Sequence, residues 1–260
     1  MKIGFVGTGH MGGSLAVAMA NSGAELYLHN RTSSKAEALA ARIGERAKVA
    51  TLAETVACDY VLLGVKPKDV AGLLADPVWQ GIKGIVVSMV AGLPLAKLQG
   101  MLPEAKLIRI LPNTPVAVGE GLTLVCYGEG VAEAEKRAFE GLMAPTGTLA
   151  PIEEDKLDAA SVLTGSAPAY LDYFVDALIQ AGVRLGLAPK AAQDYVLGMC
   201  KGTIALAKAS DKSPLTLGQE VCSPGGSTIE GVAKLLDGGL YDAVLAACLA
   251  TDRKNRHMTD

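Results

Sequence analysis

Three glycines near the N-terminus restrict the fold of this chain more than any other feature. They follow the apolar stretch Ile3–Val6 and have the spacing Gly7-x-Gly9-x-x-Gly12. A buried strand, a tight turn and a helix with apolar residues three or four apart are therefore predicted in this order. Gly23 ends the predicted helix, and a second apolar strand begins at Leu26. This pattern predicts the first βαβ unit of a doubly wound α/β sheet.

Each glycine has a separate function in this prediction. Gly7 permits the tight turn, Gly9 lets a pyrophosphate approach the backbone, and Gly12 lets the helix pack on the strand. The free N–H groups and the positive dipole end of the helix then face the diphosphate of a dinucleotide. The alternative is a glycine-rich turn with a structural purpose alone. The position of the turn between a strand and a helix, ahead of a second strand, favours the dinucleotide.

The end of the second strand indicates which dinucleotide is bound. An NAD site usually has Asp or Glu there for the ribose 2′-hydroxyl, whereas this chain has Asn30-Arg31-Thr32-Ser33-Ser34-Lys35. Arg31 can stack on adenine and pair with a 2′-phosphate, and Thr32 and Ser33 supply further donors. The alternative is a capped, solvated helix start. Together with the glycine turn, the stretch favours NADPH, with NADH as the second choice.

The strands that follow predict a sheet of seven or eight strands. The apolar run Tyr60–Val65 is typical of a parallel strand buried on both faces, and Pro67 forces the chain out of the sheet. Lys66 is then expected at the carboxyl edge, facing cofactor or an anionic substrate; a solvated lysine is the alternative. Further strands are expected over 84–90, 106–111, 122–127 and 148–152, with 122–127 antiparallel at the edge of the sheet.

The character of the chain changes after Asp155. Apolar residues recur three or four apart over 171–185 and 195–206, and no strand pattern returns. These helices are apolar around much of their circumference, so one copy cannot bury all their faces. We expect residues 1–152 to form a Rossmann-type dinucleotide-binding domain. Residues 153–260 are expected to form an all-helical substrate-binding and dimerisation domain.

Composition excludes several classes of protein. The net charge of −3 and the low aromatic content do not fit a nucleic-acid-binding protein, and no apolar run approaches the ~18 residues of a membrane span. No secretion signal is recognised at the N-terminus, and the five scattered cysteines indicate a reduced, cytoplasmic protein. The three histidines have no metal-ligand spacing, so no metal site is expected.

A second candidate site lies in the C-terminal half. Pro224-Gly225-Gly226-Ser227-Thr228 precedes an apolar-periodic run and places free N–H groups at a helix start. Such a group of donors suits a substrate carboxylate, and Thr228 can offer its hydroxyl to a neighbouring ring nitrogen. An ordinary N-capped helix behind a flexible turn is the alternative.

Several motifs, taken together, resemble one enzyme family. They are the glycine turn, Val65-Lys66-Pro67, Ser88-x-x-Ala91-Gly92, Arg109-x-x-Pro112-Asn113-Thr114-Pro115, Leu163-Thr164-Gly165-Ser166-x-Pro168-Ala169-Tyr170 and Ser223-Pro224-Gly225-Gly226-Ser227-Thr228-Ile229. Both the motifs and their order along the chain resemble those of the pyrroline-5-carboxylate reductase family. The resemblance implies reduction of L-1-pyrroline-5-carboxylate to L-proline with NAD(P)H, the last step of proline synthesis. It also implies a homodimer, which some members assemble into larger rings.

The resemblance also implies roles for individual residues. Thr228 and Lys66 are the candidate catalytic residues, with Thr228 an orienting group at the ring nitrogen. Glu154, Gly226, Ser227 and Thr228 are the candidate substrate-binding residues. The candidate cofactor-binding residues are Gly7, Thr8, Gly9, His10, Met11, Gly12, Asn30, Arg31, Thr32, Val65, Lys66 and Ala91.

Two other functions stay open from the sequence. One is another imine or β-hydroxyacid reductase of the same architecture. A β-hydroxyacid dehydrogenase should have a catalytic lysine on its interdomain helix, and the stretch Gly165–Gly186 contains no lysine. The other is a regulator that binds the dinucleotide without turnover, for which a carboxylate site with a neighbouring hydroxyl has no purpose.

Overall fold

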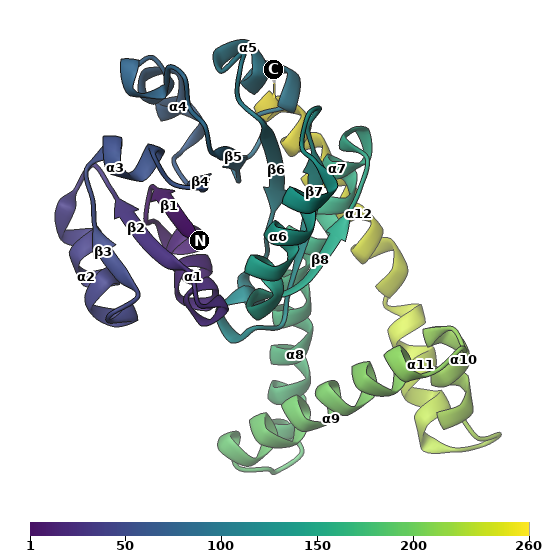
Figure 1. The fold of residues 1–260 in the computed structure, drawn as a ribbon. Helices are drawn as coiled ribbons and strands as arrows, with labels where there is room; N and C mark the ends of the chain where they lie inside the picture. The colour runs from purple at the N-terminus through teal and green to yellow at the C-terminus, as the bar shows by residue number, and fades with distance from the viewer. Residues whose placement is uncertain (260) are drawn as a thin grey trace. The chain divides into compact units, whose positions relative to one another are not determined.

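A computed structural model describes the backbone of residues 1–259 and the side chains of residues 1–255 (Figure 1). The chain divides into two compact units. The first contains Met1–Ser166 and the C-terminal residues from Asp252 onward, and the second contains Ala167–Thr251. The sheet ends with its last strand at Pro151, next to the expected division at residue 152. That division stays a prediction.

The first unit is built on an eight-stranded sheet of order β3-β2-β1-β4-β5-β6-β7-β8. The strands are β1 Lys2–Val6, β2 Glu25–His29, β3 Ala47–Val49, β4 Tyr60–Leu63, β5 Ile85–Ser88, β6 Leu107–Leu111, β7 Gly121–Tyr127 and β8 Gly147–Pro151. The first six run parallel, with β1 between β2 and β4. The doubly wound sheet predicted from the sequence is therefore confirmed.

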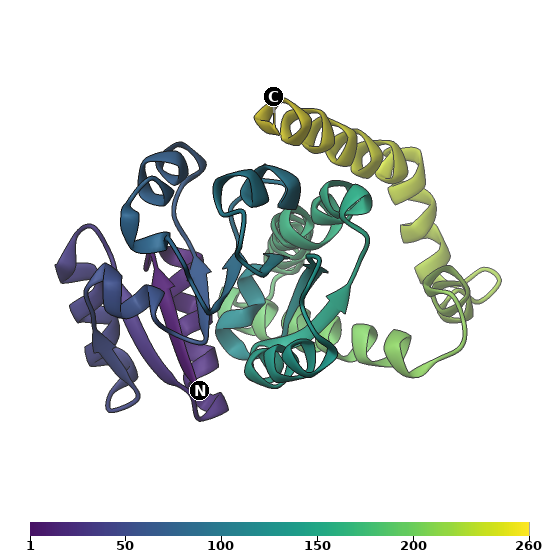
Figure 2. The same cartoon turned by 45° about the horizontal axis from the view of Figure 1, so that its top comes forward.

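Helices cover both faces of this sheet. The pleat sends Ile3 and Phe5 to one face, where α1 (His10–Met19), α2 (Ser33–Ile43) and α6 (Glu133–Met143) complete the core. Val6 points to the other face, against the core shared with α4 (Pro67–Leu74) and α5 (Leu95–Met101). Figure 2 shows α4 and α5 on one side of the strands and α6 on the other. A fully buried side chain such as Phe5 contributes roughly 2 kcal/mol to folding.

The far end of the sheet differs from the prediction in one respect. β7 is antiparallel to β6, as expected, but it is not the edge strand. β8 pairs with it in parallel, from Gly121 opposite Gly147 to Val125 opposite Pro151. The helix α6 between the two strands returns the chain to the starting end of β7, so the next strand must run in the same direction. The prediction of an edge position for 122–127 was wrong.

Short helices and turns complete the first unit. Helix α3 spans Leu52–Val56, and α7 spans Glu154–Ser161 and packs its Leu157 against β7. Between strands and helices lie the 3₁₀ turns Ala20–Ser22, Pro77–Trp79, Thr114–Val118 and Ala144–Thr146. A π-helical turn, Val162–Ser166, follows α7 and ends the unit.

The second unit is helical, as predicted. It contains α8 (Ala167–Arg184), α9 (Pro189–Ala209), α10 (Pro214–Val221), α11 (Ser227–Asp237) and the first part of α12 (Leu240–Thr259). Helices α8 and α9 meet closely at one end, because a Cβ on Gly182 would lie 3.1 Å from that of Ala192. The hydroxyl of Tyr170 on α8 is hydrogen-bonded to that of Thr251 on α12.

Most large apolar side chains of these helices are exposed within the single chain. Members of this group come from every helix of the unit; they include Leu171, Tyr173, Tyr195, Ile204, Leu206, Leu215, Leu236, Tyr241 and Leu245. Among the described residues of this unit, Ala192 is the one apolar residue that is buried. A unit with so small a core and so much exposed apolar surface needs a covering partner.

Candidate active site

A cleft lies where the winding of the sheet reverses. The chain builds β2 and β3 on one side of β1 and β4 on the other, so the loops after β1 and β4 diverge and leave a crevice at the carboxyl ends of the strands. The cleft has a volume of about 680 Å³. Its lining comes from the ends of β1 and β2, from the loops after β1, β2 and β4, from the first turn of α2 and from α4.

The glycine turn is held by a contact with a second glycine. Gly7 has φ +99°, a conformation that favours glycine, and a Cβ there would lie 2.7 Å from the backbone of Gly64. A Cβ on Gly64 would in turn lie 2.7 Å from the carbonyl oxygen of Gly7. The loops after β1 and β4 therefore meet backbone to backbone. Sequence reasoning found Gly7 and missed Gly64, because a contact between strands that are distant in sequence leaves no local pattern.

The other two glycines of the turn have different surroundings. A Cβ on Gly12 would lie 2.6 Å from the Gly7 carbonyl oxygen, so close packing of helix on strand requires glycine there, as predicted. Apart from its two chain neighbours, no described residue has an atom within 4 Å of a Cβ placed on Gly9, whose φ of −70° any residue can adopt. The protein's own packing therefore gives no reason for glycine at position 9. The open space beside it fits a group that must approach the backbone closely.

The start of α1 has the donors that such a group needs. Gly9 is the N-cap and offers no side chain, and the first turn holds no acidic residue. The hydroxyl of Thr8 is buried and has no hydrogen-bond partner among the residues described. Free helix N–H groups beside an unpartnered hydroxyl suit the phosphates of a dinucleotide. His10 is exposed and Met11 is half-buried against the core in the same turn.

Asn30 holds two loops of the cleft in place. Its Oδ1 accepts from the backbone N–H of Thr8 at 3.2 Å, and its Nδ2 donates to the carbonyl of Thr32 at 3.0 Å. The end of β2 is thereby tied to the glycine turn. Asn30 lines the cleft, and these two bonds give it a positioning role there; its contact with the cofactor stays a prediction.

The cleft is strongly cationic. Four of its lining side chains are positively charged, Arg31, Lys35, Lys66 and Lys68, whereas Asp69 is its one carboxylate among the described residues. The Arg31 side chain is 89% exposed and pairs with Asp69 at 3.7 Å. Lys35, Lys68 and Asp69 were missed from the sequence because they lie on helices, where charges usually indicate a solvated face.

The structure brings together most of the predicted cofactor residues. Gly7, Gly9, Asn30, Arg31, Thr32, Val65 and Lys66 all line the cleft. Lys66 is the N-cap of α4 at the carboxyl end of β4, where Pro67 was expected to lead the chain out of the sheet. Ala91 is exposed in the loop after β5, at the same edge of the sheet, but it is not among the residues that line the cleft.

Glu154 lies elsewhere in the first unit and has structural partners. Its Oε1 pairs with the guanidinium of Arg109 at 2.9 Å and accepts from the backbone N–H of Leu95 at 2.8 Å. Arg109 is only 2% exposed and also pairs with Asp158 at 3.2 Å. A buried guanidinium needs these carboxylates, so Glu154 joins α7 to β6 and α5. Its role at the substrate stays a prediction.

Gly226, Ser227 and Thr228 lie in the second unit, at the start of α11. The N–H of Gly226 donates to the carbonyl of Ser223 at 3.0 Å, and Gly225 has φ +70° behind Pro224. These are the features of a type II turn, which explains Pro-Gly at its centre. Gly226 is the N-cap of α11 without a side-chain cap bond. No side chain of the described residues occupies the first-turn N–H groups, and the anion site expected there stays a prediction.

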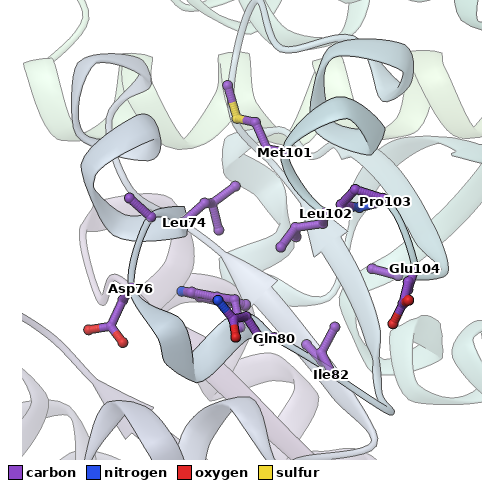
Figure 3. Close-up of a pocket in the computed structure, with 12 residues that line it drawn as sticks. Leu74, Asp76, Gln80, Ile82, Met101, Leu102, Pro103 and Glu104 are labelled. Atoms are coloured by element: carbon purple, nitrogen blue, oxygen red, sulfur yellow. The ribbon is translucent and has the colours of Figure 1, made fainter.

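A second cavity, of about 390 Å³, lies at the opposite edge of the sheet, before β5 and β6 (Figure 3). Leu74, Ile82, Met101 and Leu102 form its apolar wall, with the carboxylates of Asp76 and Glu104 at its rim. None of the predicted site residues lines it. Ligands of open α/β sheets bind at the carboxyl ends of the strands, so the cleft is the candidate cofactor site and this cavity is not.

Three further features concern metal binding, membrane spans and thiol reactivity in the described residues. No group of three or more His, Cys, Asp or Glu side chains could hold a metal ion. The described helices include none that is long and apolar enough to cross a membrane. All five cysteines are free, and burial raises the pKa of the Cys58 and Cys126 thiols to about 11, which makes them poor nucleophiles at neutral pH.

Two family models match the chain. Residues 2–92 match the model described as "NADP oxidoreductase coenzyme F420-dependent". Residues 154–258 match the model described as "Pyrroline-5-carboxylate reductase dimerisation". The first match covers β1 to β5 and hence the cleft, and the second covers α7 and the helical unit.

Relatives and solved structures agree with these matches. Pyrroline-5-carboxylate reductase of Aquifex aeolicus is 34% identical over 99% of this chain and 97% of its own length. Human pyrroline-5-carboxylate reductase 2 is 33% identical over 100% of this chain and 85% of its own. The crystal structure of the Streptococcus pyogenes enzyme superposes with a TM-score of 0.89 at 28% identity, covering 99% and 98% of the two chains. The chain therefore belongs to the pyrroline-5-carboxylate reductase family.

Proposed function

We propose that this chain reduces L-1-pyrroline-5-carboxylate to L-proline with NADPH. The observation that carries the proposal is the likeness to pyrroline-5-carboxylate reductases over nearly the whole length of both chains. The structure of the Plasmodium falciparum pyrroline carboxylate reductase, described "with NADP bound", is 28% identical and matches with a TM-score of 0.88 over 100% of both chains. When bound, NADPH supplies the hydride that reduces the imine carbon.

The proposed cofactor site is the cleft beside β1. The N–H groups at the start of α1 and the hydroxyl of Thr8 bind the diphosphate, and the missing side chain of Gly9 admits it. Arg31 binds the 2′-phosphate, aided by Thr32 and by Lys35 at the start of α2. Lys66 contributes positive charge at the end of β4. Val65 and Ala91, at neighbouring strand ends, are proposed as further cofactor contacts.

The proposed substrate site is the start of α11. The N–H groups of Ser227 and Thr228 bind the substrate carboxylate, because no side chain caps this helix start and Gly226, as its N-cap, leaves the approach to them open. The Thr228 hydroxyl hydrogen-bonds the ring nitrogen and orients the imine. A hydroxyl is a weak acid, so its contribution is positioning. The proposed place of Glu154 near the substrate rests on the family resemblance alone.

The assembly is proposed to be a homodimer formed by the helical unit. The exposed apolar side chains of α8 to α12 and the match to a dimerisation model support this. A larger ring of dimers and a cytoplasmic location remain predictions from the sequence; the five free cysteines fit a reducing compartment.

Oxidation of NADPH with L-1-pyrroline-5-carboxylate, followed by the loss of its near-ultraviolet absorbance, tests the proposal. Rapid, substrate-dependent loss is expected, with a slower rate for NADH. Tight NADPH binding without turnover of this substrate would contradict the proposed reaction but would not contradict the proposed cofactor site. Thr228→Ala should reduce turnover with little change in NADPH affinity. Unchanged turnover in this variant would exclude the role given to Thr228.

A further inference from the structure

Among the described residues that line the cationic cleft, the one carboxylate lies beside the residue that should recognise the 2′-phosphate. Asp69 Oδ1 is 3.7 Å from Nη1 of Arg31, and both side chains line the cleft. Arg31 extends from the loop after β2 and Asp69 from the first turn of α4. The pair therefore spans the cleft between two elements that are distant in sequence.

The two partners differ in how firmly they are held. The Arg31 side chain is 89% exposed, so it can turn toward a ligand at little cost. Asp69 is 35% exposed, and a carboxylate in the first turn of a helix is stabilised by the helix dipole. Arg31 is thus the mobile partner and Asp69 the fixed one.

A 2′-phosphate at Arg31 creates a conflict that a 2′-hydroxyl does not. The phosphate and Asp69 would share one guanidinium, and two anions close together repel each other. NADH has a neutral hydroxyl at this position, which leaves the Arg31–Asp69 pair intact. A carboxylate is also the usual acceptor for the ribose hydroxyl in NAD sites, and the end of β2 lacks one here.

We propose that Asp69 competes with the 2′-phosphate for Arg31. This competition lowers the ratio of NADPH affinity to NADH affinity in the cleft. The inference deepens the proposed function and rests on its assignment of the cleft to NADPH. Asp69 acts through Arg31, so it is a residue that sets specificity and takes no part in the reduction itself.

Asp69→Asn tests this inference, with the dissociation constants of NADPH and NADH measured by titration of the nucleotide fluorescence without imine substrate. We expect NADPH to bind roughly threefold to tenfold more tightly at low salt, with NADH binding unchanged or weaker. High salt should reduce the gain. Equal changes for both nucleotides, or none, would overturn the inference. Because no turnover is involved, this result is independent of whether the proposed reaction is correct.

Two further variants separate competition from a general charge effect. In an Arg31→Ala background, Asp69→Asn should give less than about half of its gain for NADPH, because the contested guanidinium is gone. The same gain in both backgrounds would exclude competition for Arg31. Asp76→Asn is the matched control, since it removes the same charge just beyond the other end of α4 and outside the cleft. Its ratio of NADPH to NADH affinity should equal that of the unmodified protein, and an increase equal to that of Asp69→Asn would overturn the inference.

Discussion

At the scale of single residues, Gly9 and Gly12 belong to one turn but have different reasons to be glycine. The space beside Gly9 is empty, whereas the Gly7 carbonyl oxygen occupies the place of a Cβ on Gly12. Packing of helix on strand explains glycine at position 12, whereas glycine at position 9 is explained only by the proposed diphosphate. Stability and binding measurements can separate the two.

Gly9→Ala should weaken NADPH binding by roughly tenfold or more, since its methyl group occupies the space proposed for the diphosphate. Its free energy of unfolding should fall by less than ~1 kcal/mol, the usual cost of alanine at an N-cap. Gly12→Ala should lower the free energy of unfolding by roughly 1–3 kcal/mol, because the helix must shift. Urea unfolding and NADPH titration of both variants give the comparison. Unchanged NADPH affinity in Gly9→Ala would contradict the proposed diphosphate position.

Glu154→Ala separates a structural from a substrate-binding role for this carboxylate. We expect the free energy of unfolding to fall by ~2 kcal/mol, because buried Arg109 loses one of its two carboxylates. The KM for the pyrroline substrate, measured under conditions where the variant is folded, separates the two roles: a purely structural role leaves it unchanged, whereas the proposed place of Glu154 near the substrate raises it. Asp158→Ala, which removes the other partner of Arg109, is the control. A raised KM with unchanged stability in Glu154→Ala would establish the substrate role instead.

At the scale of elements, Glu135 fastens the start of α6 to the sheet. Its carboxylate pairs with Lys106, just before β6, at 2.7 Å and accepts from the backbone N–H of Ala132 at 2.8 Å. The bond from Lys106 and then that from Ala132 lower the pKa of this carboxyl below its usual 4.5. A lowered pKa in the folded state means that the stabilisation is present above pH ~4.5 and is lost as the pH falls through the folded-state value.

Glu135→Gln should therefore be less stable than the unmodified protein near neutral pH, and the two should converge as the pH falls below ~4.5. The free energy of urea unfolding, measured from neutral to acidic pH, checks this. Glu37→Gln, the same substitution at an exposed carboxylate of α2 outside this ion pair, is the matched control. A difference between Glu135→Gln and the unmodified protein that persisted at acidic pH would show that charge is not the cause.

Local sequence patterns predict where strands, helices and turns lie better than they predict which of these elements contact one another. The strand over residues 2–6, the glycine turn and the exit at Pro67 follow from periodicity and backbone chemistry, which act over a few residues. The place of β7 inside the sheet depends on its pairing with β8, which no local pattern encodes. For the same reason the cleft-lining role of Asp69 and the ion pair between Glu154 and Arg109 could not be predicted.

At the scale of the whole molecule, the two units differ in what they bury. The first encloses two continuous cores on the faces of its sheet, while the second exposes large apolar side chains on all its helices. Apolar surface of this extent on a protein usually marks an interface. The second unit should thus depend on association for its stability.

Leu197→Glu combined with Leu245→Glu should shift the proposed homodimer toward the monomer, because a charge buried in an interface without a partner costs several kcal/mol. Sedimentation velocity at several protein concentrations measures the shift. Val118→Glu, at an exposed apolar residue of the first unit, should leave the mass unchanged. If the double variant had the same dimer dissociation constant as the unmodified protein, the interface would have to lie away from these two residues.

The backbone contact between Gly7 and Gly64 has a genetic consequence. A side chain at either position would strike main-chain atoms of the other loop, and main-chain atoms are the same for every amino acid. No replacement at one position can make room for a replacement at the other. In a saturation library, neither glycine should have a second-site suppressor at its counterpart, so the two positions should be invariant without covarying.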